Sequence, residues 1–181
     1  PRHVSSGPAQ VIVSNPAAYV VDCGDGVARQ LAFAQVPFTA LRHIFVTHHH
    51  SDHNLELGPL LYNAWVGGLQ SEIGVHGLEG LENLLAAYWE SNRFDIETRI
   101  ADEGRPDVRR VIWPKEFGSR PVLNAGEVRV AALRNRHPPV RESYALRFEL
   151  GPTTVVFSGD TAYLPELADF ARRADYLVHE A

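Results

Sequence analysis

The chain carries the stretch Phe45-Val46-Thr47-His48-His49-His50-Ser51-Asp52-His53, in which an apolar run leads into a cluster of histidines. Four imidazoles and one carboxylate lie within the seven residues 47–53. Neutral imidazole together with carboxylate suits borderline divalent metals, above all zinc, and imidazole is the commonest metal ligand in proteins. In an extended backbone His48 and His50 point to the same side, because they are two residues apart, so one ion can contact both. The stretch therefore predicts a metal site at the end of a strand rather than a solvated polar loop.

Short apolar runs alternate with amphipathic stretches on both sides of this histidine motif, residues 48–53. They predict strands at residues 11–13, 19–21, 44–47, 73–76, 128–133, 144–150, 153–157 and 176–178, and helices at 27–34, 57–65, 78–90 and 164–173. The stretch 96–119, rich in Gly, Pro and charged residues, predicts a loop region with a strand near Val111. Helices interleaved with strands predict an α/β class, in which active sites usually lie where strands end and loops begin.

The composition is that of an ordinary globular domain. The chain has 181 residues, 45% of them hydrophobic and 22% charged, which predicts one hydrophobic core. No apolar run approaches the roughly 18 to 20 residues of a membrane-spanning helix, so we expect no membrane partner. The net charge of -5 argues against a hold on nucleic acid by the whole surface, since phosphate binding normally needs a concentrated basic face. The single cysteine, Cys23, cannot form an internal disulfide, so a cytoplasmic and a periplasmic location both stay open.

The motif His48-x-His50-x-Asp52-His53 resembles the signature of the metallo-β-lactamase superfamily, whose members bind one or two metals at the edge of an αβ/βα sandwich. With the upstream segments Val21-Asp22-Cys23-Gly24-Asp25-Gly26 and Arg29-Gln30-Leu31, the chain resembles the ribonuclease Z and arylsulfatase-like branch in particular. The resemblance implies an α/β (α+β) fold, a four-layer αβ/βα sandwich that spans residues 1–181 as a single domain. The family's first strand would precede Pro1 and its last segment would follow Ala181, so we expect the sandwich to be incomplete at both ends.

Two downstream segments fit the same family pattern. His137 follows the predicted strand at 128–133 and precedes Pro138-Pro139, as the family's third histidine on the first metal does. The segment Phe157-Ser158-Gly159-Asp160-Thr161 resembles the one whose aspartate bridges both metals. Taken alone, His137 would more often be an ordinary surface or core histidine, and Asp160 a turn residue or a helix N-cap. Their order behind the histidine motif favours the ligand interpretation for both.

Carried over residue by residue, the resemblance implies a full set of ligands for one metal and a partial set for a second. His48, His50 and His137 would hold the first metal, Asp52 and His53 the second, and Asp160 both. The family supplies one more histidine to the second metal, downstream of the segment that Val178-His179-Glu180-Ala181 resembles. We therefore expect two Zn²⁺ ions in a complete domain, and one or two in this chain.

The expected chemistry is hydrolysis. Two zinc ions a few ångströms apart lower the pKa of a shared water to around neutrality and provide a metal-bound hydroxide as the nucleophile. We expect Asp52 to be catalytic as well as a ligand, because it can orient this hydroxide and accept its proton. Glu180, beside His179, matches a glutamate that helps proton transfer in ribonuclease Z, and it is the second catalytic candidate. The alternative is that Glu180 and His179 simply end a strand.

Residues around the motif have two interpretations each. His49 lies between two expected ligands and should point away from the metal, supporting its neighbours rather than binding. For Asp22 and Asp25, in the preceding turn, the resemblance implies that one carboxylate orients a ligand histidine. Aromatic residues can line a pocket or lie in the core, and arginines near His137 can receive an anionic substrate or be merely solvated. These aromatic and arginine candidates are Tyr62, Trp65, Trp89, Arg134, Arg136 and Arg141.

The spacing between two expected ligands bears on the substrate. Asp160 lies 23 positions after His137, and the predicted hairpin at 144–157 fills most of them. Many ribonuclease Z members insert here an extended arm that grips transfer RNA, for which this spacing leaves no room. Together with the acidic balance, this argues against dedicated tRNA binding. It favours a small-molecule or short nucleotide substrate, namely a phosphodiester, a sulfate ester, or a carboxylic ester or lactone.

Three alternatives to this hydrolase stay open. The chain can still be a ribonuclease Z-type RNA endonuclease. The same fold also carries iron for oxygen or sulfur chemistry, and histidine and carboxylate ligands do not decide between the metals, so an iron-dependent oxidoreductase is the second alternative. The third is an inactive or partner-binding truncated member, or one that completes its site as a homodimer by exchanging segments with a second copy.

Overall fold

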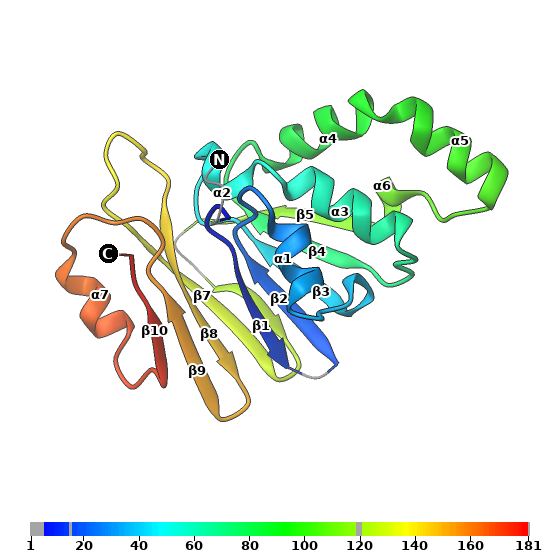
Figure 1. The fold of residues 1–181 in the computed structure, drawn as a ribbon. Coiled ribbons are helices and arrows are strands. Elements are labelled where there is room, and N and C mark those ends of the chain that lie inside the picture. The colour runs from blue at the N-terminus through cyan, green and yellow to red at the C-terminus, as the bar shows by residue number, and fades with distance from the viewer. Residues whose placement is uncertain (1–5, 15, 119–120, 181) are drawn as a thin grey trace. The chain divides into compact units, whose positions relative to one another are not determined.

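The computed structural model describes residues 6–14, 16–118 and 121–180 (Figure 1). The chain divides into two compact units. Unit 1 comprises residues 1–46 and 50–116, and unit 2 comprises residues 47–49 and 117–181. The predicted domain ends at Pro1 and Ala181, and Ser119 at the end of the predicted loop region, lie outside the described residues. The mixture of helices and strands in both units confirms the α/β class.

Unit 1 is built on a five-stranded sheet in the order β1-β2-β3-β4-β5. β1 is antiparallel to β2, and all the other neighbours are parallel, so the chain must cross over between them. Because parallel strands end at the same edge, the segments that follow β2 and β3 start side by side there. The strands are β1 (Gln10–Ser14), β2 (Ala17–Val21), β3 (Leu41–Phe45), β4 (Ile73–Gly77) and β5 (Ile112–Glu116).

The core of unit 1 lies between this sheet and its helices. The two-residue period of the strands puts Val20, Ile44 and Val75 in one row across the sheet, all of them buried. Leucines at helical spacing pack against this row, and each fully buried leucine contributes about 1.5–3 kcal/mol. The helices are α1 (Val27–Phe33), the 3₁₀ turn η1 (Phe38–Ala40), α2 (Ser51–Asn54), α3 (Leu57–Val66), α4 (Leu81–Ser91), α5 (Arg93–Glu103) and α6 (Val108–Val111).

The prediction of a loop region over residues 96–119 is wrong for most of its length. Helices α5 and α6 and strand β5 occupy it, although the expected strand near Val111 is confirmed as β5. The charged residues of α5 form ion pairs one turn apart, with Arg99 2.8 Å from Asp95 and 2.9 Å from Glu103. Gly104 ends that helix in the left-handed conformation, and Asp107 caps the next one through the Arg109 N–H. The Gly and charged residues are therefore helix ends and helix surfaces.

Unit 2 contains a second five-stranded sheet in the order β10-β9-β8-β7-β6, antiparallel except for β9 and β10. Val130, Phe148 and Phe157 lie on its apolar face, while Arg129 and Arg147 alternate onto the other. The hairpin predicted around residues 151–152 is confirmed, whereas β6 was missed. The elements are β6 (Pro121–Ala125), β7 (Val128–Arg134), β8 (Tyr144–Leu150), β9 (Thr153–Phe157), α7 (Pro165–Phe170) and β10 (Tyr176–Val178).

No helix in the described part of the chain combines the length and the apolar character needed to cross a bilayer.

Candidate metal centre

His48 is held as an extra strand residue beside β8. Its backbone forms an isolated antiparallel bridge with Ser143, and the Tyr144 N–H donates to the Thr47 carbonyl at 3.1 Å. The His48 side chain is completely buried within the molecule. Residues 47–49 thus belong to unit 2, although they directly follow strand β3 of unit 1.

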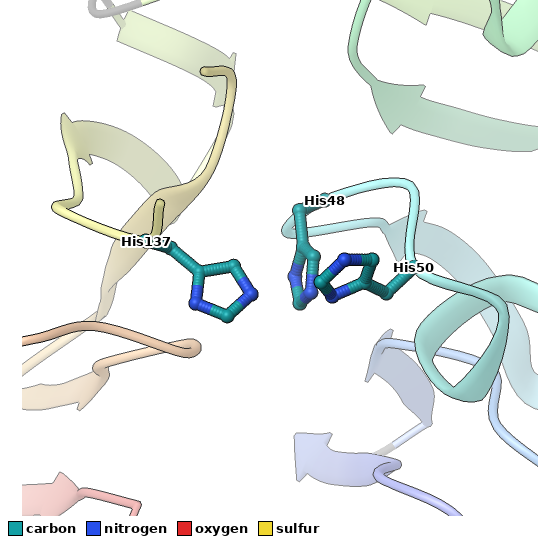
Figure 2. Close-up of side chains that lie close together, drawn as sticks. All are labelled: His48, His50 and His137. Atoms are coloured by element: carbon teal, nitrogen blue, oxygen red, sulfur yellow. The ribbon is translucent and has the colours of Figure 1, made fainter. Parts of the chain in front are cut away.

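His137 and Asp160 approach His48 within unit 2. Asp160 Oδ2 lies 4.0 Å from His48 Nε2 and 3.9 Å from His137 Nε2. The rings of His48 and His137 meet edge to face, with their centroids 4.9 Å apart. Figure 2 shows these two side chains, together with that of His50, two residues further along the chain. The structure thus brings together three predicted ligands from three separate loops of unit 2.

Several hydrogen bonds hold the loop that carries Asp160. The Asn135 side chain donates from Nδ2 to the Ser158 carbonyl at 2.6 Å, and the Ala162 N–H donates to the Arg136 carbonyl at 2.6 Å. Asn135 and Arg136 immediately precede His137. Gly159 has a φ of 58°, and a Cβ there would lie 2.8 Å from the Tyr144 carbonyl oxygen, so the loop requires glycine at this position. The Asp160 and His137 loops are therefore fixed to each other.

The rest of the histidine motif lies in unit 1. His50 is extended, with φ −68° and ψ 144°, and helix α2 begins at the next residue. This turn into a helix places His53 in the interior while Asp52 stays 63% exposed. His53 Nε2 lies 3.8 Å from Asp52 Oδ2. The His50 Cα lies within about 7.6 Å of the His48 Cα, because consecutive Cα atoms are about 3.8 Å apart.

A buried carboxylate orients His53. Asp22 Oδ2 lies 2.8 Å from His53 Nδ1, and both side chains are only 3% exposed. An ionised carboxylate only accepts hydrogen bonds, so Nδ1 donates to Asp22, and Nε2 lies on the Asp52 side of the ring. Of the two carboxylates proposed from the sequence for orienting a ligand, Asp22 makes the contact.

The turn after β2 is packed tightly against the motif. Asp22 has a left-handed φ of 62°, and its N–H donates to the Phe45 carbonyl at 2.8 Å. The Cys23 N–H donates to the His53 carbonyl at 2.6 Å. A Cβ on Gly24 would lie 2.2 Å from the Asp52 carbonyl oxygen, so any larger residue would displace one of the two backbones. This turn therefore sets the position of residues 52 and 53.

The donor set of unit 2 fits a divalent metal. Zinc binds imidazole nitrogen and carboxylate oxygen at about 2.0–2.2 Å, so two atoms on one ion are at most about 4.3 Å apart. The distances from Asp160 Oδ2 to His48 Nε2 and to His137 Nε2 both fall within this limit. The ligand nitrogens of His48 and His137 lie within 4.8 Å of each other, close to the same limit. Burial raises the pKa of the Cys23 thiol well above its usual range, so no thiolate competes with these ligands at neutral pH.

The outlying aromatic candidates belong to the core. Trp65 is 1% exposed, and its Nε1–H donates to the Pro106 carbonyl at 2.7 Å. Trp89 is buried in the same cluster, and the Tyr62 hydroxyl donates to the Asp95 carboxylate. His49, predicted from the sequence to support its neighbours rather than bind metal, is half-buried. The interpretation as core is confirmed for Trp65 and Trp89, whereas Tyr62 is partly buried and packs against the same cluster.

The three arginines near His137 differ in their contacts. Arg134 donates from Nε to the Arg141 carbonyl at 2.9 Å and pairs with Glu142, so it is a structural residue. Arg136 and Arg141 are exposed, and their guanidinium groups pair with none of the residues that the structure describes. These two guanidinium groups are available to an anion.

Glu180 makes a contact that the sequence does not predict. Its carboxylate accepts a hydrogen bond from the Thr161 N–H, directly after Asp160. The His179 Nδ1 lies 2.6 Å from the Glu180 carbonyl oxygen. Asn135, Ser158 and Thr161 were missed as parts of this site, because a lone Asn, Ser or Thr in a loop has no distinguishing spacing.

Known structures identify the fold. The metallo-β-lactamase fold protein YhfI from Bacillus subtilis matches with a TM-score of 0.72 and 23% identity, over 98% of this chain and 65% of that one. The short form of human tRNase Z matches with a TM-score of 0.73 and 19% identity, over 97% of this chain and 71% of that one. The chain therefore has the metallo-β-lactamase fold, as the motif predicted.

The sequence comparisons identify the family. The chain belongs to the family described as "Anti-Pycsar protein Apyc1", which matches residues 9–181. Ribonuclease Z from Mycobacterium bovis (strain BCG / Pasteur 1173P2) is 30% identical over 177 residues, which are 96% of this chain and 63% of that protein. The chain thus spans less than two thirds of this relative's length. The expected ribonuclease Z-like branch is confirmed, and the likeness to arylsulfatases stays a prediction.

Proposed function

We propose that this chain carries the metal-binding and catalytic residues of a metal-dependent phosphodiester hydrolase. The convergence of His48, His137 and Asp160 in unit 2 is the observation that carries this proposal. The family relation to proteins named ribonuclease Z supports a phosphodiester bond as the target. Sulfate esters, carboxylic esters and lactones are alternative substrates for the same test.

The proposed ligand set is the one implied by the sequence motif. One metal is held by His48, His50 and His137, a second by Asp52 and His53, and Asp160 contacts both. The short chain distance from His48 to His50 supports one metal for both residues. The Asp22 hydrogen bond to His53 Nδ1 supports Nε2 as the ligand atom of that residue. Zinc is the proposed metal because hydrolysis needs no change of oxidation state and zinc has no redox chemistry; the imidazole and carboxylate donors by themselves also accept iron.

Each residue then has a chemical role. A bound divalent ion lowers the pKa of a coordinated water and stabilises negative charge on a phosphoryl oxygen. The exposed Asp52 carboxylate accepts a proton from the attacking water. Arg136 and Arg141 flank His137 and provide guanidinium donors for the substrate phosphate. These arginines are the second reason to prefer an anionic ester over a neutral one.

RNA is the strongest competing substrate. The residues between His137 and Asp160 form strands β8 and β9 and their connections, which is why we propose a small phosphodiester. The relatives named ribonuclease Z give no support to the prediction that dedicated tRNA binding is absent. Both substrate classes therefore belong in one experiment.

The test is turnover of a substrate panel by the metal-loaded protein. The panel contains bis(p-nitrophenyl) phosphate, a p-nitrophenyl sulfate, a p-nitrophenyl ester, a lactone and a precursor tRNA. We expect chelator-sensitive cleavage of the phosphodiester, with Arg136→Gln and Arg141→Gln raising KM more than they lower kcat. Cleavage of the sulfate or the ester alone would contradict the proposal. If the precursor tRNA is cleaved faster than bis(p-nitrophenyl) phosphate, the proposed substrate is RNA rather than a small phosphodiester.

A further inference from the structure

The end of strand β10 is joined to the start of the loop that carries Asp160. β10 runs parallel to β9, with Val178 paired to Phe157. The Ser158 N–H donates to the Val178 carbonyl at 2.9 Å, and the Glu180 N–H donates to the Ser158 Oγ at 3.2 Å. The two backbones therefore stay adjacent as both leave the sheet.

The Glu180 side chain completes this contact. Its carboxylate accepts from the N–H of Thr161. On the other side of the same residue, the Arg136 N–H donates to Thr161 Oγ1 at 3.3 Å, and the Ala162 N–H donates to the Arg136 carbonyl. The residue after Asp160 is thus held from two directions, by the His137 loop and by Glu180.

We propose that Glu180 is a positioning residue, which holds Asp160 in place through the Thr161 N–H. This inference rests on the proposed function, because it assumes that the Asp160 carboxylate is a metal ligand. Hydrogen bonds from an N–H to a carboxylate are stronger than those to a neutral acceptor, so the contact can set the direction of a short loop. The Asp160 side chain is itself partly exposed, and its backbone follows the left-handed Gly159.

The competing role is proton transfer, which the resemblance to ribonuclease Z implies for Glu180. The two roles need different chemistry at the same atom. Acceptance from Thr161 needs only an oxygen lone pair, which a glutamine also provides. Proton transfer needs a carboxyl group that titrates, which glutamine lacks. The conservative variant therefore separates the two roles.

The experiment compares Glu180→Ala with Glu180→Gln in the whole chain. The readouts are hydrogen exchange at the Thr161 amide, zinc affinity, and the pH profile of kcat on bis(p-nitrophenyl) phosphate. We expect Glu180→Ala to speed exchange at Thr161 at least about tenfold, and to weaken zinc binding about 10–100-fold, as for other residues that orient ligands. Glu180→Gln should restore most of both, with the pH profile of kcat unchanged in shape. Glu166→Ala and Glu166→Gln, on the surface of α7, are the matched controls.

Two results would overturn the inference. In the first, Glu180→Gln is as damaging as Glu180→Ala and removes one limb of the pH profile, which makes Glu180 a proton donor. In the second, neither variant changes exchange at Thr161. Absence of hydrolysis by the wild type would instead count against the proposed function, because exchange and zinc affinity still decide the role of Glu180 without turnover.

Discussion

The candidate ligands of unit 2 and those of unit 1 are built in opposite ways. In unit 2, His48, His137 and Asp160 come from three loops, and backbone hydrogen bonds between two of these loops hold them. In unit 1, Asp52 and His53 belong to one short helix, and a separate buried carboxylate orients the histidine. The positions of the unit 2 candidates depend on hydrogen bonds between loops, whereas those of the unit 1 candidates depend on one tight turn.

This difference decides how each group should respond to substitution. Loss of a loop contact in unit 2 shifts a ligand while the fold remains, because β7, β8 and β9 pair over their whole length without it. In unit 1, changes in the turn at residues 22–24 reach the backbone of the motif directly. Substitutions in unit 2 should therefore affect activity more than stability, and substitutions in this turn should affect both.

The largest expected loss of activity comes from substitution of one carboxylate in each unit, Asp52 in unit 1 and Asp160 in unit 2. Asp52→Ala and Asp160→Asn should each lower kcat/KM by ~10²–10⁴-fold, because in the proposed mechanism each carboxylate contacts the attacking water or its metal. The measurement is turnover of bis(p-nitrophenyl) phosphate with zinc content determined in parallel. Asp102→Asn, on the exposed surface of α5, is the control. Full activity in both variants would contradict the proposed site.

His76 of unit 1 is not a candidate metal ligand, so its effect on the pH dependence of stability can be measured without metal. His76 is buried on the sheet, with Nε2 3.0 Å from His43 Nδ1. Burial, followed by the charges of His43 and Lys115, lowers the pKa of His76 to about 4. The pKa of the unfolded side chain is about 6.5, so the unfolded state binds more protons between these values. Stability from neutral His76 is thus present above pH about 6.5 and is lost as the pH falls towards 4.

This loss should amount to roughly 3 kcal/mol of unfolding free energy at the acid end of the window. Urea unfolding of the metal-free chain between pH 4.5 and 7.5 measures it. His76→Gln should flatten this dependence, whereas His179→Gln, an exposed histidine of unit 2, should leave it in place. An unchanged slope in His76→Gln would show that other groups cause the pH dependence.

The orienting contact of unit 1 should have a smaller effect. Asp22→Asn keeps a residue that tolerates the left-handed backbone but removes the charge that holds the ring proton on His53 Nδ1. We expect zinc affinity to fall about 10–100-fold, measured by competition with a chromogenic chelator. Asp25→Asn, three residues on in the same turn, is the matched control. Equal losses in both variants would mean that the charge of the turn matters and the contact does not.

The tight turn itself gives the smallest expected change. Gly24→Ala places a Cβ against the Asp52 carbonyl oxygen, so one backbone must move. We expect unfolding free energy to fall by about 1–3 kcal/mol, as in other overpacked sites, together with weaker zinc binding. In Gly118→Ala the new Cβ would meet only Tyr144 Oη, at 3.8 Å, and this variant should unfold like the wild type. Denaturant unfolding of both variants makes the comparison, and equal stability would contradict the close packing of the turn.

The sequence indicates the histidine motif more directly than the candidate ligands of the distant loops. Residues 48–53 are contiguous, so their spacing alone predicts a metal site, although His48 belongs to unit 2 and residues 50–53 belong to unit 1. Asp160 and His137 could be predicted only by resemblance, because their meeting depends on strand pairing across many residues. Glu180 was predicted from the resemblance as a catalytic residue, but its contact with the Thr161 N–H and that of Asn135 with the Ser158 carbonyl could not be predicted, since each is made to a backbone group. The missed helix α5 shows the same limit, because its ion pairs look like a loop until the helical spacing is seen.

The most direct test of the central claim is zinc binding by the wild type, His137→Ala and His53→Ala, with turnover of bis(p-nitrophenyl) phosphate before and after chelation. The account predicts that the wild type binds one or two zinc ions per chain and loses hydrolysis on chelation. Zinc should restore this hydrolysis, and each variant should lose both affinity and turnover. A wild-type chain that binds no zinc at micromolar concentration, or that hydrolyses the substrate equally well in chelator, would contradict it.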